Sequence, residues 1–192
     1  MEKIAVKRVA VAAETITIVL VLVMCGLVVP LLLRGQTTVF AQNAQFLIGP
    51  MVNCALIVAA IRFKRIWSTL GIVCLPSALA IAGGMFLAIG NIYLLFMVPF
   101  IWLGNLALVM TFRYLRIRSA RNYITVAACA VVTKALIIFG GFAILFAAGA
   151  ISPGPAAMMW NTMGVYQLIT ATVGAFLAFG ILYMYARRKK HL

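Results

Sequence analysis

Long apolar runs alternate with short polar or basic stretches along all 192 residues of the chain. A helix that crosses a bilayer needs about 20 mostly apolar residues, and it satisfies its own backbone hydrogen bonds in lipid. The pattern therefore predicts an all-α integral membrane protein with six transmembrane helices in one domain, 1–192. The expected helices cover about 9–33, 46–61, 67–88, 92–112, 123–148 and 159–185.

Prolines and glycines mark the places where these helices should be irregular. Pro30 lies near the outer end of the first helix, where it is expected to kink the helix or to end its regular hydrogen bonding. Gly49 and Pro50 are expected to break the outer end of the second helix. The stretch from Gly149 to Met158 is rich in proline and glycine, and it predicts a turn-rich outer loop.

Composition and charge support a membrane protein and fix its expected orientation. Hydrophobic residues make up 66% of the chain and charged residues 9%, with a mean hydropathy of +1.17. The formal net charge of +14 could indicate nucleic-acid binding, but most basic residues form four short clusters on one side of the predicted helices. Basic loops mark the cytoplasmic side, so both termini are expected in the cytoplasm and no nucleic-acid partner is expected. The clusters are Lys3, Lys7 and Arg8; Arg62, Lys64 and Arg65; Arg113, Arg116, Arg118 and Arg121; and Arg187, Arg188, Lys189 and Lys190.

The longest polar interruption, from Arg34 to Asn53, falls on the opposite, outer face. Its amide and hydroxyl side chains supply neutral donors and acceptors, as expected of a lid over a bound ligand. The residues from this stretch that we expect to contact a ligand are Gln36, Gln42, Asn43, Gln45 and Asn53.

A second set of expected ligand contacts lies at the outer ends of the later helices: Asn91, Tyr93, Trp160, Asn161, Tyr166 and Gln167. Apolar walls with a few hydrogen-bonding groups suit a pocket for a flat, polar-edged organic molecule. An ordinary belt of interfacial aromatic residues is the alternative, above all for Tyr93 and Trp160. It explains Gln45, Asn53 and Gln167 less well, because an amide that faces lipid is costly.

Two ionisable residues fall inside predicted helices, where lipid makes a charge costly. These are Glu14 in the first helix and Lys134 in the fifth. They could form a mutual ion pair inside the bundle, or Lys134 could face the ligand cavity and meet an anionic group of the substrate. Extension of Lys134 alone to the membrane surface is the third alternative.

Side chains that perform catalysis or bind metals are scarce. The sole histidine is His191, and the only acidic residues are Glu2 and Glu14. The four cysteines stand on four different predicted helices, without CxxC spacing or a nearby histidine, and are expected to pack as small apolar residues. The sequence therefore predicts no enzyme, no metal site and no cofactor.

Five segments carry a resemblance to a known family: AQFLIGPMVNCALIVAA, CLPSALAIAGG, FMVPFIWLGNLALVMTFRYL, VTKALIIF and YQLITATVGAF. Through them the chain resembles small six-helix bacterial proteins related to the substrate-binding S components of energy-coupling factor (ECF) vitamin transporters. The resemblance spans nearly the whole length, and its motifs are mostly hydrophobic.

The resemblance implies a multi-pass protein of the bacterial plasma membrane that captures a vitamin-like molecule from outside. In that family the S component docks on a membrane scaffold subunit that binds two cytoplasmic ATPases, and the absence of a Walker-A motif here fits ATP hydrolysis on partner subunits. An outer face without carboxylates argues against a cationic nutrient. The long amide-rich first loop makes cobalamin the first guess among family substrates, with pantothenate, folate and queuosine-like bases also open.

The same family docks through an Ala-x-x-x-Ala face on its first helix. Here Ala10 and Ala13 are small residues of that helix, but no two of its alanines stand four apart, whereas Ala78 and Ala82 of the third helix do. Both pairs are candidate docking residues. Two other functions remain open: a structural or assembly subunit of another membrane complex, and a self-sufficient small-solute carrier.

Overall fold

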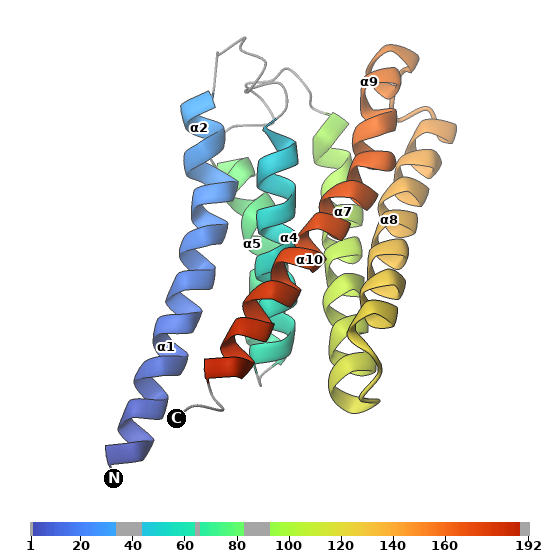
Figure 1. Ribbon diagram of the computed structural model, residues 1–192. Coiled ribbons are helices and arrows are strands. Elements are labelled where there is room, and N and C mark those ends of the chain that lie inside the picture. Colours follow the sequence, from blue (N-terminus) through green and yellow to red (C-terminus); the bar gives the residue numbers. More distant parts are fainter. Residues whose placement is uncertain (1, 34–43, 64–65, 83–92, 189–192) are drawn as a thin grey trace.

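The computed structural model describes residues 2–33, 44–63, 66–82 and 93–188, and these residues are overwhelmingly helical, which confirms the all-α class (Figure 1). In chain order the helices are α1 (Glu2–Val23), the π-helical η1 (Met24–Val28), α2 (Val29–Leu33), α4 (Gln45–Arg62), α5 (Ile66–Ala82), α7 (Tyr93–Thr111), the π-helical η2 (Phe112–Arg118), α8 (Tyr123–Ala147), α9 (Pro153–Met163) and α10 (Val165–Arg188).

Four helical stretches are long and apolar enough to cross a membrane, and two more are apolar but shorter. The long ones are Gln45–Arg62, Tyr93–Arg118, Tyr123–Ala147 and Met159–Arg187, and the shorter ones are Thr15–Val28 and Trp67–Ala82. These lengths and compositions are those of a multi-pass membrane protein. The third predicted helix is described only as far as Ala82, and the rest of its expected range lies outside the described residues.

Successive long helices run in opposite directions, so that α1 begins and α10 ends at the same end of the bundle (Figure 1). The ends of α4 and η2 and the start of α8 lie there too, which gathers the described residues of the four basic clusters at one end. We refer to it as the basic end. The guanidinium of Arg62, at the end of α4, lies 3.9 Å from the ring centroid of Tyr185 near the end of α10.

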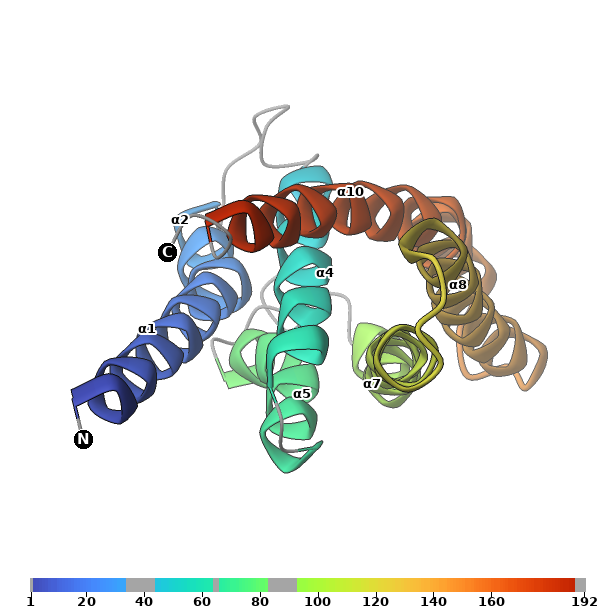
Figure 2. The same ribbon diagram turned by 60° about the horizontal axis from the view of Figure 1, so that its bottom comes forward.

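The helix α10 runs along one side of the bundle, from beside α8 toward α1, and covers α4 (Figure 2). The most extensive contacts join α4 to α10 and α7 to α8. They enclose a large apolar core in which Leu56, Leu108 and Phe112 are fully buried. A smaller core, which includes Phe142 and Met159, lies between α7, α8 and the segment around α9.

The segment that precedes the last long helix differs from the prediction. The stretch around Pro153 was expected to be loop, and the last helix was expected to begin at Met159, but α9 already begins at Pro153 and the helix is interrupted at Gly164. Proline is favoured in the first turn of a helix, where its missing N–H is not needed. The prolines that indicated a turn therefore begin a helix.

The first helix continues to Leu33 through the π-helical turn η1, which immediately precedes the stretch that contains Pro30. Proline was expected to disturb regular hydrogen bonding there, and the change from α-helical to π-helical pairing over Met24–Val28 agrees with that expectation. Pro50 was expected to break the second helix, but it lies inside the continuous helix α4, so that expectation is wrong.

Arg113 ties three segments together at the basic end. Its Nη1 donates hydrogen bonds to the carbonyl oxygen of Phe63 at 2.7 Å and to Oγ1 of Thr69 at 3.3 Å. Phe63 is the C-cap of α4, where backbone carbonyls lack helical partners, and Thr69 belongs to α5. The guanidinium therefore holds the end of α4 and the start of α5 against η2.

We expect Arg113→Gln to lower the free energy of unfolding by about 1.5–3 kcal/mol, the range for a lost hydrogen bond to a charged group. Thermal unfolding in detergent, followed by circular dichroism, measures the change. The control is Arg118→Gln, which removes an exposed guanidinium from the same π-helical segment and is expected to change stability by less than about 0.5 kcal/mol. Equal effects of the two substitutions would contradict this role of Arg113.

Candidate solute-binding site

Three polar residues lie at a similar depth inside the bundle: Asn53 on α4, Asn105 on α7 and Lys134 on α8. Their side chains are 2%, 3% and 3% exposed. A rise of ~1.5 Å per residue places Asn53 roughly 14 Å from Arg62, Asn105 roughly 12 Å from Arg113 and Lys134 roughly 16 Å from the start of α8. That depth is about half of a ~30 Å hydrocarbon layer. We call these three residues the polar layer.

Lys134 and Asn53 are joined directly. Lys134 Nζ donates a hydrogen bond of 2.5 Å to Asn53 Oδ1 and so links α8 to α4. The alternative in which Lys134 reaches the membrane surface alone is wrong, because the side chain is buried. The sequence predicts both residues as ligand contacts, but it does not indicate that they contact each other.

An ion pair between Lys134 and Glu14 is not favoured by the arrangement of the helices. In both views α1 and α8 stand at opposite edges of the bundle, with α4 and α10 between them (Figures 1 and 2). The side chain of Glu14 lies outside the described part of the structure, so the pair stays a prediction. The only other acidic residue of the chain, Glu2, is also on α1, and the four helices α4, α7, α8 and α10 contain none.

Close backbone contact between α4 and α10 positions Asn53. A Cβ added to Gly174 would lie 2.6 Å from Asn53 Cβ and 2.8 Å from the carbonyl oxygen of Pro50, so only glycine fits there. One turn nearer the outer end, Gly49 of α4 meets the side chain of Thr170 in the same way. Neither contact can be predicted from the sequence, since glycines in apolar helices are common and do not indicate what they pack against.

Asn105 is held at the level of Lys134 by its neighbour. A Cβ on Gly104 would lie 3.2 Å from the carbonyl oxygen of Lys134, which shows how closely α7 and α8 approach there. Asn105 Oδ1 has no hydrogen-bond partner among the described residues, and the same holds for the buried Nε1 of Trp102. Asn105 could have been identified from the sequence by the argument applied to Asn53. A buried amide inside an apolar helix is costly unless it has a hydrogen-bond partner.

Three predicted ligand contacts lie near the outer end of the α4–α10 pair. Gln45 is the first residue of α4 and is half-buried. Tyr166 packs its ring against Phe46 with the centroids 4.7 Å apart. Gln167 Nε2 donates to the carbonyl oxygen of Thr162 at 3.2 Å, across the interruption at Gly164. The structure brings Gln45, Tyr166 and Gln167 to the outer end of the α4–α10 pair, whereas Asn53 lies near the middle of α4.

Three more predicted ligand contacts lie on α9 or beside it. Tyr93 Oη lies 3.3 Å from Ser152 Oγ, and the ring of Trp160 packs edge-on against Phe139 at 5.1 Å. Trp160 and the exposed Asn161 line a groove of about 340 Å³ together with Phe146 and Pro153. With 52% of its surface exposed, Trp160 fits the interfacial belt as well as it fits a ligand contact.

The remaining site predictions concern the outer connections and the docking residues. Gln36, Gln42, Asn43 and Asn91 lie outside the described residues. Ala13, Ala78 and Ala82 are exposed on α1 and α5, and of Ala10 only the backbone is described. Their exposure leaves the docking prediction untested.

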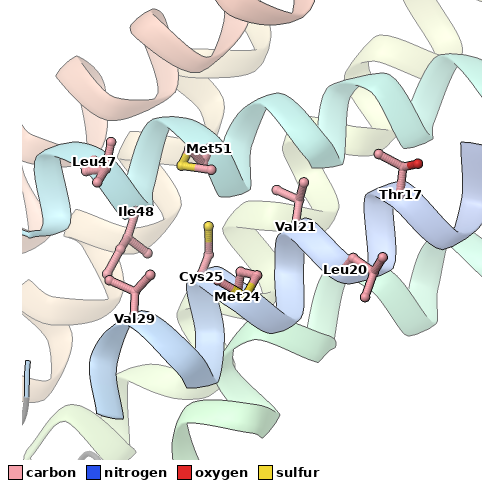
Figure 3. A pocket seen from close by; sticks show the side chains of 9 residues that line it. All are labelled: Thr17, Leu20, Val21, Met24, Cys25, Val29, Leu47, Ile48 and Met51. Carbon is pink, nitrogen blue, oxygen red and sulfur yellow. The ribbon is translucent and has the colours of Figure 1, made fainter. Parts of the chain in front are cut away.

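Two apolar grooves of about 400 Å³ and 380 Å³ adjoin each other beside α1. The first is lined by Thr17, Leu20, Val21, Met24, Cys25, Val29, Leu47, Ile48 and Met51, from α1, η1, α2 and α4 (Figure 3). The second continues between α1, α4 and α10 toward Val58 and Ile181. Apart from Thr17 their lining is apolar, so they suit hydrocarbon rather than a polar solute.

The described side chains include no cluster of three or more His, Cys, Asp or Glu residues that could hold a metal. All four cysteines are free thiols. The polar groups that the described interior offers are a buried lysine amine with an amide partner, a buried amide oxygen and an indole N–H.

Comparisons with protein-family models, with curated proteins and with solved structures find no match to this chain.

Proposed function

We propose that the chain is the substrate-binding S component of an ECF-type uptake transporter in the bacterial plasma membrane. In this proposal it captures a vitamin-like solute from outside, and a membrane scaffold subunit with two cytoplasmic ATPases supplies the energy for import. The chain itself catalyses no reaction. The observation that carries the solute-binding part is Lys134, a buried lysine whose described partner is a neutral amide.

A buried ammonium without an opposite charge is costly, because burial removes its water and an amide oxygen replaces only part of that solvation. Three N–H groups are available on the ammonium, and Asn53 accepts one of them. The surrounding helices α4, α7, α8 and α10 contain no acidic residue. An anionic group of a solute would supply the missing charge, and this favours solute recognition over a purely structural lysine.

The same argument narrows the substrate class. A carboxylate or phosphate group would be attracted to Lys134, whereas a cationic nutrient would be repelled by it. Cobalamin, which carries a phosphodiester, remains the first guess, and pantothenate and folate, which carry carboxylates, are the alternatives. The basic end is the cytoplasmic end in this proposal, so the solute enters from the end that contains Gln45 and α9.

The test is calorimetric titration of the purified protein in detergent with cobalamin, cobinamide, pantothenate, folate and riboflavin. We expect one solute to bind with nanomolar affinity, equivalent to about −12 kcal/mol. Affinity purification from the native membrane in mild detergent is expected to recover a scaffold protein with two ATPases. A folded, monodisperse sample that binds none of the five compounds would contradict the proposal.

The exposed small residues Ala78 and Ala82 on α5 favour a second candidate, an assembly subunit of another membrane complex. That function predicts a membrane partner without ATPases and no solute binding. Transport by the purified chain alone in liposomes would instead indicate a self-sufficient carrier.

A further inference from the structure

Two polar atoms on one face of α7 are buried without a hydrogen-bond partner among the described residues. They are Nε1 of Trp102, which can only donate, and Oδ1 of Asn105, which can only accept. They stand three positions apart in the helix, so they lie on neighbouring turns of the same face. The Asn105 side chain is 3% exposed, and its amide oxygen is therefore shielded from both lipid and water.

Each such group costs about 1–3 kcal/mol when it stays unpaired in a buried position. Leucine or phenylalanine would fill the same space in an apolar helix without this cost. A donor and an acceptor that are retained side by side, at the depth of Lys134, therefore indicate a function in recognition rather than in packing.

The position of the pair relative to Lys134 defines what it could recognise. Gly104 packs against the backbone of Lys134, which places Asn105 at the level of Lys134 and Trp102 one turn nearer the outer end. If a molecule enters from the outer end and its anionic group reaches Lys134, the part of the molecule next to that group lies beside Trp102 and Asn105.

We propose that Trp102 and Asn105 recognise a secondary amide group in the same solute whose anionic group is bound by Lys134. The carbonyl oxygen and the N–H of a trans amide point in opposite directions, so the amide lies between the two side chains. Trp102 Nε1 donates to its carbonyl oxygen, and Asn105 Oδ1 accepts from its N–H. This inference rests on the proposed solute-binding function, and it defines the substrate class further: an acid that carries a secondary amide next to its anionic end.

The test compares two probes, pantothenate and its ester analogue, in which the amide N–H is replaced by oxygen. Calorimetry is done on the wild type, Asn105→Leu, Trp102→Phe and Lys134→Met. We expect the wild type to prefer the amide over the ester by about tenfold or more, because a site with an unpaired acceptor rejects a ligand that lacks the donor. Asn105→Leu is expected to lose that preference while it still binds the ester.

The second readout is stability, which separates recognition from a structural role. If Asn105 serves the solute, Asn105→Leu removes an unpaired buried acceptor and is expected to raise the midpoint of thermal unfolding in the absence of solute. A lower midpoint, with the amide preference unchanged, would show that Asn105 is paired within the protein or by a bound water and would overturn the inference.

A fluorine resonance reports on Trp102 directly. Protein labelled with 5-fluorotryptophan contains three reporters, at the three tryptophans of the chain, and Trp102→Phe assigns the relevant signal. We expect this signal to shift on addition of pantothenate in wild-type protein. If binding depends on Lys134 but pantothenate does not shift the Trp102 signal and Asn105→Leu does not change the amide preference, this inference alone is overturned. If wild-type protein binds neither probe, both this inference and the assignment of an acidic amide as the substrate are overturned. Failure of the whole vitamin panel would overturn the proposed function.

Discussion

Lys134→Met is expected to weaken solute binding by roughly two orders of magnitude while the bundle stays folded. Loss of a buried charged partner from a binding site typically costs 2–5 kcal/mol, and every 1.4 kcal/mol is about a factor of ten in affinity. Methionine has a similar length and no charge, so the substitution removes the buried ammonium without leaving a large cavity. Calorimetry with the solute identified from the panel measures the affinity.

The thermal midpoint of the same variant distinguishes between the possible roles of Lys134. Removal of a desolvated charge is expected to leave the midpoint unchanged or to raise it, since Asn53 alone loses a partner. If an ion pair with Glu14 were the reason for Lys134, the variant would unfold at a lower temperature and Glu14→Gln would partly restore it. We expect no such rescue, because α1 and α8 lie at opposite edges of the bundle. Wild-type affinity in Lys134→Met would refute its role in binding.

Gly174→Ala is expected to lower the free energy of unfolding by about 1–3 kcal/mol, the range for overpacking a tight contact. The added methyl group would lie 2.8 Å from the carbonyl oxygen of Pro50 and 3.0 Å from the backbone nitrogen of Cys54. Backbone atoms cannot turn away as a flexible side chain can, so α10 and α4 have to separate. Thermal unfolding of the purified variant measures the loss, and solute affinity is expected to fall with it because Asn53 is displaced from Lys134.

The matched control is Gly180→Ala on the same helix. A Cβ at Gly180 would meet no atom within 4 Å, and alanine is the better helix former by about 1 kcal/mol. We therefore expect a neutral or slightly stabilising effect there. A similar loss of stability at both glycines would show that flexibility of α10, and not its contact with α4, decides the outcome.

Most of the helices could be predicted from the sequence because lipid leaves a chain few alternatives. Once an apolar run is long enough to span a bilayer, only a helix can pair its backbone groups within the run. The bounds of α4 and α8 accordingly lie close to the expected ones. The start of α9 at Pro153 was not predictable in this way. Proline disrupts a helix when it lies in the interior, but it is favoured in the first turn.

The composition of the site was only partly predictable. Burial cost alone selected Asn53 and Lys134, because an amide or an ammonium inside an apolar helix needs a partner. Their pairing depends on the rotation of α4 relative to α8, which is determined by contacts such as Gly174 against Asn53. Such contacts join residues far apart in the sequence, and a single sequence contains no sign of them. Asn105 meets the same criterion of burial cost but was not selected, and nothing in the sequence distinguished Trp102 from an ordinary apolar residue of its helix.

The apolar grooves beside α1 determine how the protein should be handled. In a bilayer, we expect acyl chains to fill such a groove and to complete the packing of α1 and η1 against α4 and α10. Extraction with a short-chain detergent is expected to remove these acyl chains and to loosen the α1 side of the bundle before the contact between α4 and α10. We therefore expect samples in nanodiscs, or with added phospholipid, to keep the first helix packed against α4.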